Sequence, residues 1–209
     1  MVESTSKHII AGREVNFFET AHNISDTFGI AISTSLGNII YTGDYIIEFS
    51  SGETGFAFNL KALEPIASKP TFLLMSESKA STREGFCSPK HKIYNKIARK
   101  ITSSEKRVFI SCFWENYYRI KEIITAVKAA HKKIYFYNDY TRWVMEQLME
   151  CEDSIYLDRN DIIEKEDLLR VKQSDVVILL LGRGQKLYEE FNKKLSDNNT
   201  NQICDSSNS

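Results

Sequence analysis

The pattern of apolar residues changes near Ser81, and this change constrains the fold more than any other feature of the sequence. Three short β-rich runs come before it: VNFFET (15–20), FGIAIST (28–34) and NIIYTGD (38–44). The tripeptide SLG separates the last two runs and predicts a hairpin or meander. A short helix is expected at 60–67 and an apolar strand, TFLLM, at 71–75.

After Ser81 helical and strand patterns alternate. Helices are predicted from Ser88 and Pro89 onward, around 120–127 and at 141–151. The strands are VFISCF (108–113), IYFY (134–137) and VVILLLG (176–182). This alternation favours a parallel sheet with helical crossovers, and the nearly uniform apolar run VVILLLG suits a strand covered on both faces.

These patterns divide the chain into three parts. Residues 1–81 form a β region, residues 82–187 an α/β domain, and residues 188–209 a terminal helix followed by a polar tail that we expect to be disordered.

Composition limits the classes of protein that the chain can belong to. Of its 209 residues, 42% are apolar and 26% are charged, which is typical of a folded protein. We expect no membrane association, because no apolar run approaches a span of about 18 residues and the amino terminus lacks a secretory pattern. The four cysteines have no CxxC spacing, so they are interpreted as free thiols and the protein as cytoplasmic.

Charge is uneven along the chain although the formal net charge is only -1. Residues 83–133 contain thirteen Lys and Arg against four Asp and Glu, whereas residues 139–175 contain five against eleven. Solvated helix faces explain such blocks, and so does a basic surface that binds phosphates. The sequence leaves both explanations open.

Four motifs carry a resemblance to a known family. They are HNISDTFG (22–29), TGDY (42–45), LLMSESKASTREGF (73–86) and VVILLLGRGQ (176–185). In this order the motifs resemble an internal portion of ribonuclease J, a β-CASP member of the metallo-β-lactamase superfamily, over roughly residues 15–187. The resemblance implies an α/β fold, in which the C-terminal part of a metallo-β-lactamase β-layer is followed by a β-CASP-like parallel α/β domain.

The resemblance also implies a function and a site. The family hydrolyses RNA phosphodiesters with two zinc ions, so the resemblance implies a hydrolase of RNA metabolism. By the resemblance, His22 is a terminal zinc ligand, Asp44 is the bridging carboxylate, and Glu77 is the catalytic acidic residue beside the metals. Without the resemblance, the sequence favours the interpretation of His22 as a loop histidine that hydrogen-bonds its neighbours.

The sequence departs from the family in its metal ligands. The HxHxDH cluster and the later histidines of the family are missing, and His8, His91 and His131 each stand alone. One histidine and one aspartate cannot hold two zinc ions, since each ion needs about four ligands. We therefore expect a truncated or degenerate form that does not fully bind zinc and does not catalyse alone.

The expected RNA-binding positions have also changed. Trp114 and Glu115 stand where the family places small hydroxyl residues, and Asp139 adds another acid. The predicted phosphate or RNA contacts are Arg119, Arg183 and Lys186. The segment GRGQK (182–186) fits an anion-binding helix start, and it also fits a plain strand-to-helix turn.

Three hypotheses follow from the sequence. The chain is a ribonuclease J-like portion that is inactive alone, or a non-catalytic subunit that binds RNA or forms an oligomer with itself or with a ribonuclease J-like partner. The third hypothesis is a small α/β domain that binds an anion near Gly182 and Gly184.

Overall fold

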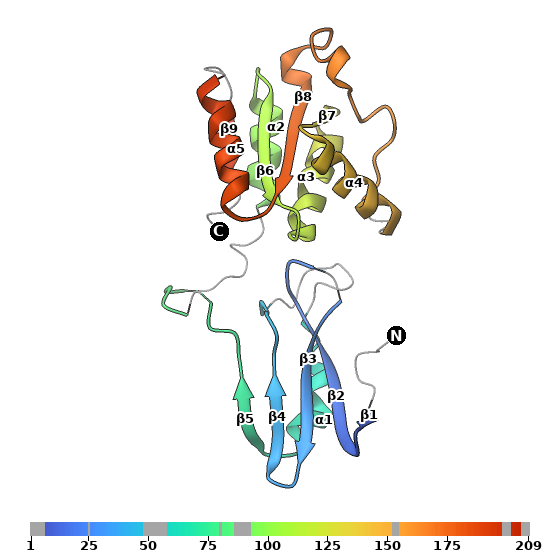
Figure 1. Cartoon of the computed structure of the whole chain (residues 1–209), viewed down its shortest axis with the longest axis vertical. Coiled ribbons are helices and arrows are strands. Elements are labelled where there is room, and N and C mark those ends of the chain that lie inside the picture. Colours follow the sequence, from blue (N-terminus) through green and yellow to red (C-terminus); the bar gives the residue numbers. More distant parts are fainter. Residues whose placement is uncertain are drawn as a thin grey trace. The chain divides into compact units, whose positions relative to one another are not determined.

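The computed structural model describes residues 7–24, 26–47, 58–79, 81–85, 93–151, 155–197 and 202–205. The chain divides into two compact units, Met1–His91 and Lys92–Ser209 (Figure 1). The three-part division made from the sequence stays a prediction. In the described part of the chain, no helix is both long enough and apolar enough to cross a membrane.

Unit 1 is built on a five-stranded sheet in the order β1-β2-β3-β4-β5. The strands are β1 (Lys7–Ile10), β2 (Arg13–Thr20), β3 (Thr27–Thr34), β4 (Gly37–Tyr41) and β5 (Thr71–Met75). Strands β1 to β4 pair antiparallel, and β5 pairs parallel with β4. The four predicted strands are confirmed as β2 to β5, whereas β1 was not predicted.

A short helical segment covers one face of this sheet. It consists of η1 (Leu60–Leu63) and α1 (Glu64–Ala67), which confirms the helix expected at 60–67. The core beneath it is formed by buried residues of the sheet and the helix: Phe18, Ala31, Ala62 and Ile66, with Ile40 and Leu63 packed against them. The ring of Phe18 lies against Gly29, where any Cβ atom would overlap it.

The hairpin between β3 and β4 depends on Gly37. This residue has φ +126°, and a Cβ atom there would overlap the Pro70 carbonyl oxygen. The Asn38 amide donates to that same oxygen over 2.8 Å, which fixes the start of β4 beside the segment that leads into β5. Glycine is therefore required by both the backbone conformation and the close approach.

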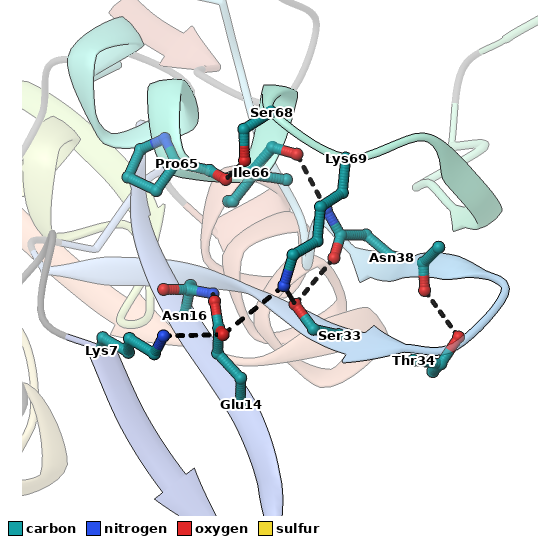
Figure 2. A network of polar contacts seen from close by, with 11 residues as sticks. Lys7, Glu14, Asn16, Ser33, Thr34, Asn38, Pro65, Ile66, Ser68 and Lys69 are labelled. Atoms are coloured by element: carbon teal, nitrogen blue, oxygen red, sulfur yellow. Dashed lines mark hydrogen bonds and ion pairs between the residues drawn. The ribbon is translucent and has the colours of Figure 1, made fainter.

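A polar network ties the helical segment to the sheet (Figure 2). The Asn38 side chain donates to the Ile66 carbonyl over 2.8 Å and accepts from the Ser33 hydroxyl over 2.9 Å. Lys69 Nζ donates to Ser33 over 3.1 Å and also contacts Glu14. Lys7 Nζ lies 2.8 Å from Glu14, and this hydrogen bond is the main reason, ahead of the one from Asn16, why the pKa of the Glu14 carboxyl is lowered to about 2.

Unit 2 is built on a four-stranded parallel sheet in the order β7-β8-β6-β9. Its elements are α2 (Tyr94–Ser103), β6 (Val108–Phe113), α3 (Tyr117–Ala129), β7 (Lys133–Phe136), α4 (Asp139–Cys151), η2 (Lys165–Asp167), η3 (Gln173–Asp175), β8 (Val176–Gly182), α5 (Gly184–Asp197) and β9 (Gln202–Asp205). The parallel sheet that the alternating pattern predicts is confirmed. Together the two units are a mixed α/β fold.

Strand β8 lies at the centre of unit 2 and is covered on both faces. Its six apolar side chains, from Val176 to Leu181, are all at most 5% exposed. On one face of the strand, Ile178 packs with Ile163 and Leu180 packs with Leu187 of α5. On the other face, Val177, Leu179 and Leu181 are at most 1% exposed. The expectation of a strand covered on both faces is confirmed.

Two predictions for unit 2 are not confirmed. The helix start predicted at Ser88 and Pro89 falls outside the described residues, and the described helix begins at Tyr94. Within the tail expected to be disordered, residues 202–205 form β9 and pair with β6. The physical reason is that β6 would otherwise leave one row of backbone amides and carbonyls without strand partners.

Candidate functional site

The sheet of unit 1 brings the predicted metal-site residues to one edge. Strand β3 runs antiparallel to both β2 and β4, so β2 and β4 share a direction, which β5 also follows (Figure 1). The carboxyl ends of these three strands therefore meet at one edge. His22 follows β2, Asp44 follows β4 and Glu77 follows β5. Their roles as ligands or catalyst stay predictions.

Hydrogen bonds connect the three segments at this edge. Ala21 and Ile46 form an antiparallel bridge, and the Ile46 amide donates to the Ala21 carbonyl over 2.7 Å. The Tyr45 amide donates to Glu77 Oε2 over 3.2 Å. The residues just after Asp44 are thus held by the segment of His22 on one side and by Glu77 on the other.

A glycine turn presents Asp44 at this edge. The Thr42 amide donates to the Met75 carbonyl over 3.1 Å, so pairing with β5 continues to the turn. Gly43 has φ +62°, a conformation that glycine adopts without strain. Asp44, directly after it, is exposed, whereas His22 and Glu77 are half-buried.

These residues do not fit a complete two-zinc centre. One imidazole and two carboxylates supply too few ligands for two ions that need about four each. One oxygen of Glu77 already accepts the Tyr45 amide. Among the residues that the structure describes, no three or more His, Cys, Asp or Glu side chains are grouped to hold a metal ion.

The carboxyl edge of the unit 2 sheet carries the second set of predicted residues. Arg183 is 78% exposed, and its Nε lies 2.8 Å from Glu115 Oε1, so an ion pair joins the segments that follow β8 and β6. Lys186 is exposed on the first turn of α5. An anion at this position has to compete with the Glu115 carboxylate for Arg183.

Asparagine side chains already cap two helices at this edge. Asn116 Oδ1 accepts the Arg119 amide over 3.1 Å at the start of α3. Asn138 Oδ1 accepts the Thr141 amide over 2.8 Å at the start of α4. A capped amide does not bind an anion without losing its cap, so these two helix starts lend no support to the hypothesis of a small anion-binding domain.

Arg119, a predicted RNA contact, is not on the surface. It is 4% exposed and forms an ion pair with Glu122, whose other oxygen accepts the Tyr94 amide over 3.0 Å. The pair therefore links α3 to the start of α2. Burial raises the pKa of the Glu122 carboxyl, although Arg119 acts in the opposite direction. The three-residue spacing of Arg119 and Glu122 predicts that their side chains touch on one face of a helix. It does not predict that the pair is buried.

The clearest basic surface in the described part of the chain is one face of α2. Lys96, Arg99 and Lys100 are exposed, while Ile97 and Ile101 are buried beneath them. None of the three cations forms an ion pair with a described residue. This face is the structural counterpart of the basic block seen in the sequence.

Sequence comparisons connect the chain to ribonuclease J. No family model matches it. It is 32% identical to ribonuclease J 2 of Staphylococcus saprophyticus over 126 residues, which are 60% of this chain and 22% of that protein. It is 28% identical to ribonuclease J of Mycoplasma genitalium over 180 residues, 86% of this chain and 30% of that protein. Against ribonuclease J 2 of Streptococcus pyogenes it is 24% identical over 169 residues, 81% of this chain and 30% of that protein.

A solved structure supports the fold. The crystal structure of a protein of unknown function from Enterococcus faecalis V583 matches with a TM-score of 0.56 and 13% identity, covering 98% of this chain and 55% of that one. This likeness shows an α/β fold. The chain spans less than a third of the length of these ribonuclease J relatives, and it is in sequence a partial ribonuclease J-like relative.

Proposed function

We propose that the chain is a portion of a ribonuclease J-like RNA-processing protein of the metallo-β-lactamase and β-CASP type, and that it does not hydrolyse RNA alone. One observation carries this proposal: in a chain similar to ribonuclease J, the sheet puts His22, Asp44 and Glu77 at one edge. Residue types that a metal-dependent phosphodiesterase uses as ligands thus follow three strands whose carboxyl ends lie at the same end of the sheet.

The donor count explains why the chain would be inactive alone. One imidazole and two carboxylates are present at this end of the sheet. Each zinc ion needs about four ligands, so two ions need about eight, or somewhat fewer if one group binds both ions. The remaining donors have to come from polypeptide outside this chain. What the chain itself contributes is a hydrogen-bonded frame, in which Glu77 fixes the backbone next to Asp44.

The test measures zinc and hydrolysis together. We expect the purified 209-residue chain to hold far fewer than two zinc ions by mass spectrometry and to leave a labelled single-stranded RNA intact. If the chain binds about two zinc ions and cleaves RNA, and Asp44→Asn abolishes both, the proposed inactivity is wrong. Asp26→Asn is the matched control, because Asp26 is an exposed acid in the loop after His22.

A second candidate function is RNA binding without catalysis. The basic face of α2 favours it, since Lys96, Arg99 and Lys100 are exposed without ionic partners among the described residues. A lysine or arginine that contacts a phosphate displaces a counterion, so affinity for RNA falls as salt rises.

Charge neutralisation tests this candidate. The triple variant Lys96→Gln, Arg99→Gln, Lys100→Gln should reduce the slope of log affinity against log salt on single-stranded RNA, by about 0.7 for each phosphate that these cations neutralise. The control variant is Lys165→Gln, Arg170→Gln, Lys172→Gln, which removes three exposed cations from the acidic segment. Equal slopes for the two variants would exclude the basic face of α2 as the binding surface.

A further inference from the structure

The outer face of helix α4 carries two exposed aromatic side chains. Tyr140 is 44% and Trp143 is 56% exposed, and their ring centroids lie 6.2 Å apart with an angle of 33° between the ring planes. Tryptophan and tyrosine are, with arginine, the side chains on which the binding energy of protein interfaces is most often concentrated. An exposed pair of them on one helix therefore indicates an interaction surface.

The same face of α4 carries acids and no cation. A helix turns by about 100° per residue, so positions 139, 140, 143, 146, 147 and 150 lie within about one third of its circumference. All six residues are exposed and are called here the α4 face: Asp139, Tyr140, Trp143, Glu146, Gln147 and Glu150. The opposite side of the helix faces the core of unit 2 with Thr141, Val144 and Met145.

The acids of the α4 face do not stabilise the helix. Glu146 and Glu150 are four residues apart, a spacing at which like charges repel each other. Glu150 also lies in the last turn, which contains no basic residue and where the helix dipole disfavours an anion. None of the acids Asp139, Glu146 and Glu150 forms an ion pair with a described residue.

Elsewhere in unit 2, an aromatic ring and a carboxylate share one cation. Tyr156 is 61% exposed, and Lys128 Nζ lies 5.0 Å from the centroid of its ring. The same ammonium group lies 3.6 Å from Asp161 Oδ2. A single lysine thus interacts with a ring face and a carboxylate at the same time.

Arg142 repeats this arrangement on the flank of α4. Its guanidinium carbon lies 5.6 Å from the centroid of the Phe136 ring, and its Nη2 pairs with Glu164. Arg142 is the only cation in the sequence of α4, and it is thus engaged away from the α4 face. The α4 face offers the same rings and carboxylates, but in the described part of the chain no cation contacts them.

We propose that the α4 face binds a lysine- or arginine-rich segment of a separate protein. One cation of that segment lies over the ring of Trp143 or Tyr140, and neighbouring cations pair with the acids of the α4 face. This binding requires neither zinc nor RNA hydrolysis, so it goes beyond the proposed function.

Two other occupants fit the α4 face less well. RNA bases stack on aromatic rings, but three acids without ionic partners repel the phosphates that come with the bases. A second copy of the chain offers the basic face of α2, but two chains with a formal net charge of -1 each have no overall attraction. A basic segment is attracted by the acids and also supplies the cation for the rings.

A cationic peptide tests the inference. The probe is a peptide of three Arg-Gly-Lys-Gly repeats, which is titrated into the isotope-labelled 209-residue chain while NMR follows the indole signals of its two tryptophans. We expect the Trp143 signal to shift and the Trp114 signal to stay. A peptide with glutamine in place of each arginine and lysine should shift neither.

Affinities measured by calorimetry separate the contribution of the ring from that of charge. Trp143→Ala should weaken binding about 2- to 30-fold, and Trp143→Phe should weaken it less because it keeps a ring. The control is Leu169→Ala, which removes an apolar side chain that is 92% exposed outside the α4 face and should leave the affinity unchanged. Circular dichroism checks that each variant is folded.

A pair of double variants tests the acids. Glu146→Gln with Glu150→Gln should weaken binding about 2- to 10-fold at low salt. Glu105→Gln with Glu166→Gln removes the same charge at two exposed positions outside the α4 face and should weaken binding less.

Three results would overturn the inference. The first is equal affinity of the peptide for the parent chain and for Trp143→Ala. The second is a Trp143 shift that grows with the concentration of the chain alone and is lost in the triple variant of α2, which would identify a second copy as the occupant. The third is a Trp143 shift with single-stranded RNA, which would identify nucleic acid. None of these readouts depends on hydrolysis, so each outcome leaves the proposed inactivity to its own test.

Discussion

Strands β5 and β8 are similar in sequence and opposite in environment. Each is an apolar run, TFLLM and VVILLLG, and each pairs parallel with its neighbours. The apolar side chains of β8 are at most 5% exposed, whereas those of β5 are at least 44% exposed. The difference lies in what covers them. In unit 2 the side chains on both faces of β8 are buried. Among the described residues of unit 1, the short helical segment packs against β2, β3 and β4 in one core cluster.

This contrast separates two properties that are often treated as one. The apolar sequence of a strand indicates the environment to which the strand is suited. The exposed fraction of its side chains shows the environment that the strand has in this chain. For β8 the two agree. For β5 they disagree, because its apolar side chains are at least 44% exposed.

The largest expected effect compares matched truncations in the two strands. Leu179→Ala in β8 should lower the free energy of unfolding of unit 2 by about 2–5 kcal/mol, because it leaves a cavity in a closed core. Leu73→Ala in β5 should cost unit 1 less than about 1 kcal/mol, because the side chain is 45% exposed. Urea unfolding followed by Trp114 and Trp143 fluorescence reports unit 2, and hydrogen exchange reports unit 1. Equal costs would break the comparison.

The next effect tests how α4 is fastened to β8. Thr141 is fully buried, and its hydroxyl accepts the Leu181 amide over 2.9 Å. Thr141→Val removes this acceptor and leaves a buried amide unsatisfied, so unit 2 should lose about 1–3 kcal/mol. Thr141→Ser keeps the hydroxyl and should lose less. A valine variant as stable as the serine variant would show that the hydrogen bond does not contribute.

The buried carboxyl of Glu122 should make the stability of unit 2 depend on pH. Burial raises the pKa of Glu122 above its ordinary value of 4.5. The protonated carboxyl is therefore favoured by folding, and stability should fall as pH rises from 4.5 through the raised pKa. Glu122→Gln should flatten this fall of the free energy of unfolding above pH 4.5, as followed by urea unfolding. Glu105→Gln, at an exposed position, should leave it unchanged.

The smallest effect has the opposite sign and lies in unit 1. The pKa of Glu14 is about 2, mainly because of its hydrogen bond with Lys7. Its contribution is present above pH 4.5 and is lost as pH falls toward 2, and it is small because the pair is solvated. Lys7→Gln should move the Glu14 pKa upward in an NMR titration of the carboxyl carbon. An unmoved pKa would show that Lys7 is not the cause.

Much of the fold was predictable because apolar periodicity is local information. The alternation of apolar residues located β2, β3 and β4, and the uniform run at 176–182 located β8. The two strands that were not predicted, β1 and β9, are short, and each is defined by pairing with a strand distant in sequence or across a turn. Such pairing depends on an available edge, which the local pattern does not record.

The sequence predicted where three candidate site residues lie relative to the strands, and their roles stay predictions. His22, Asp44 and Glu77 each follow a strand, so the direction of the strands brings them to one edge. The burial of Arg119 and the ion pair between Arg183 and Glu115 depend on packing between separate elements. Both arginines were predicted to contact RNA or phosphate. In the structure Arg119 is buried, and Arg183 forms an ion pair with Glu115.

The contact between Phe18 and Gly29 also constrains how this protein can evolve. The aromatic ring occupies the space that any side chain at position 29 would need, so Gly29 cannot be replaced while the ring at position 18 is kept. A larger residue at 29 becomes acceptable only after the ring at 18 is replaced by something smaller. We therefore expect lineages of this chain that carry a side chain at position 29 to carry a residue smaller than phenylalanine at position 18.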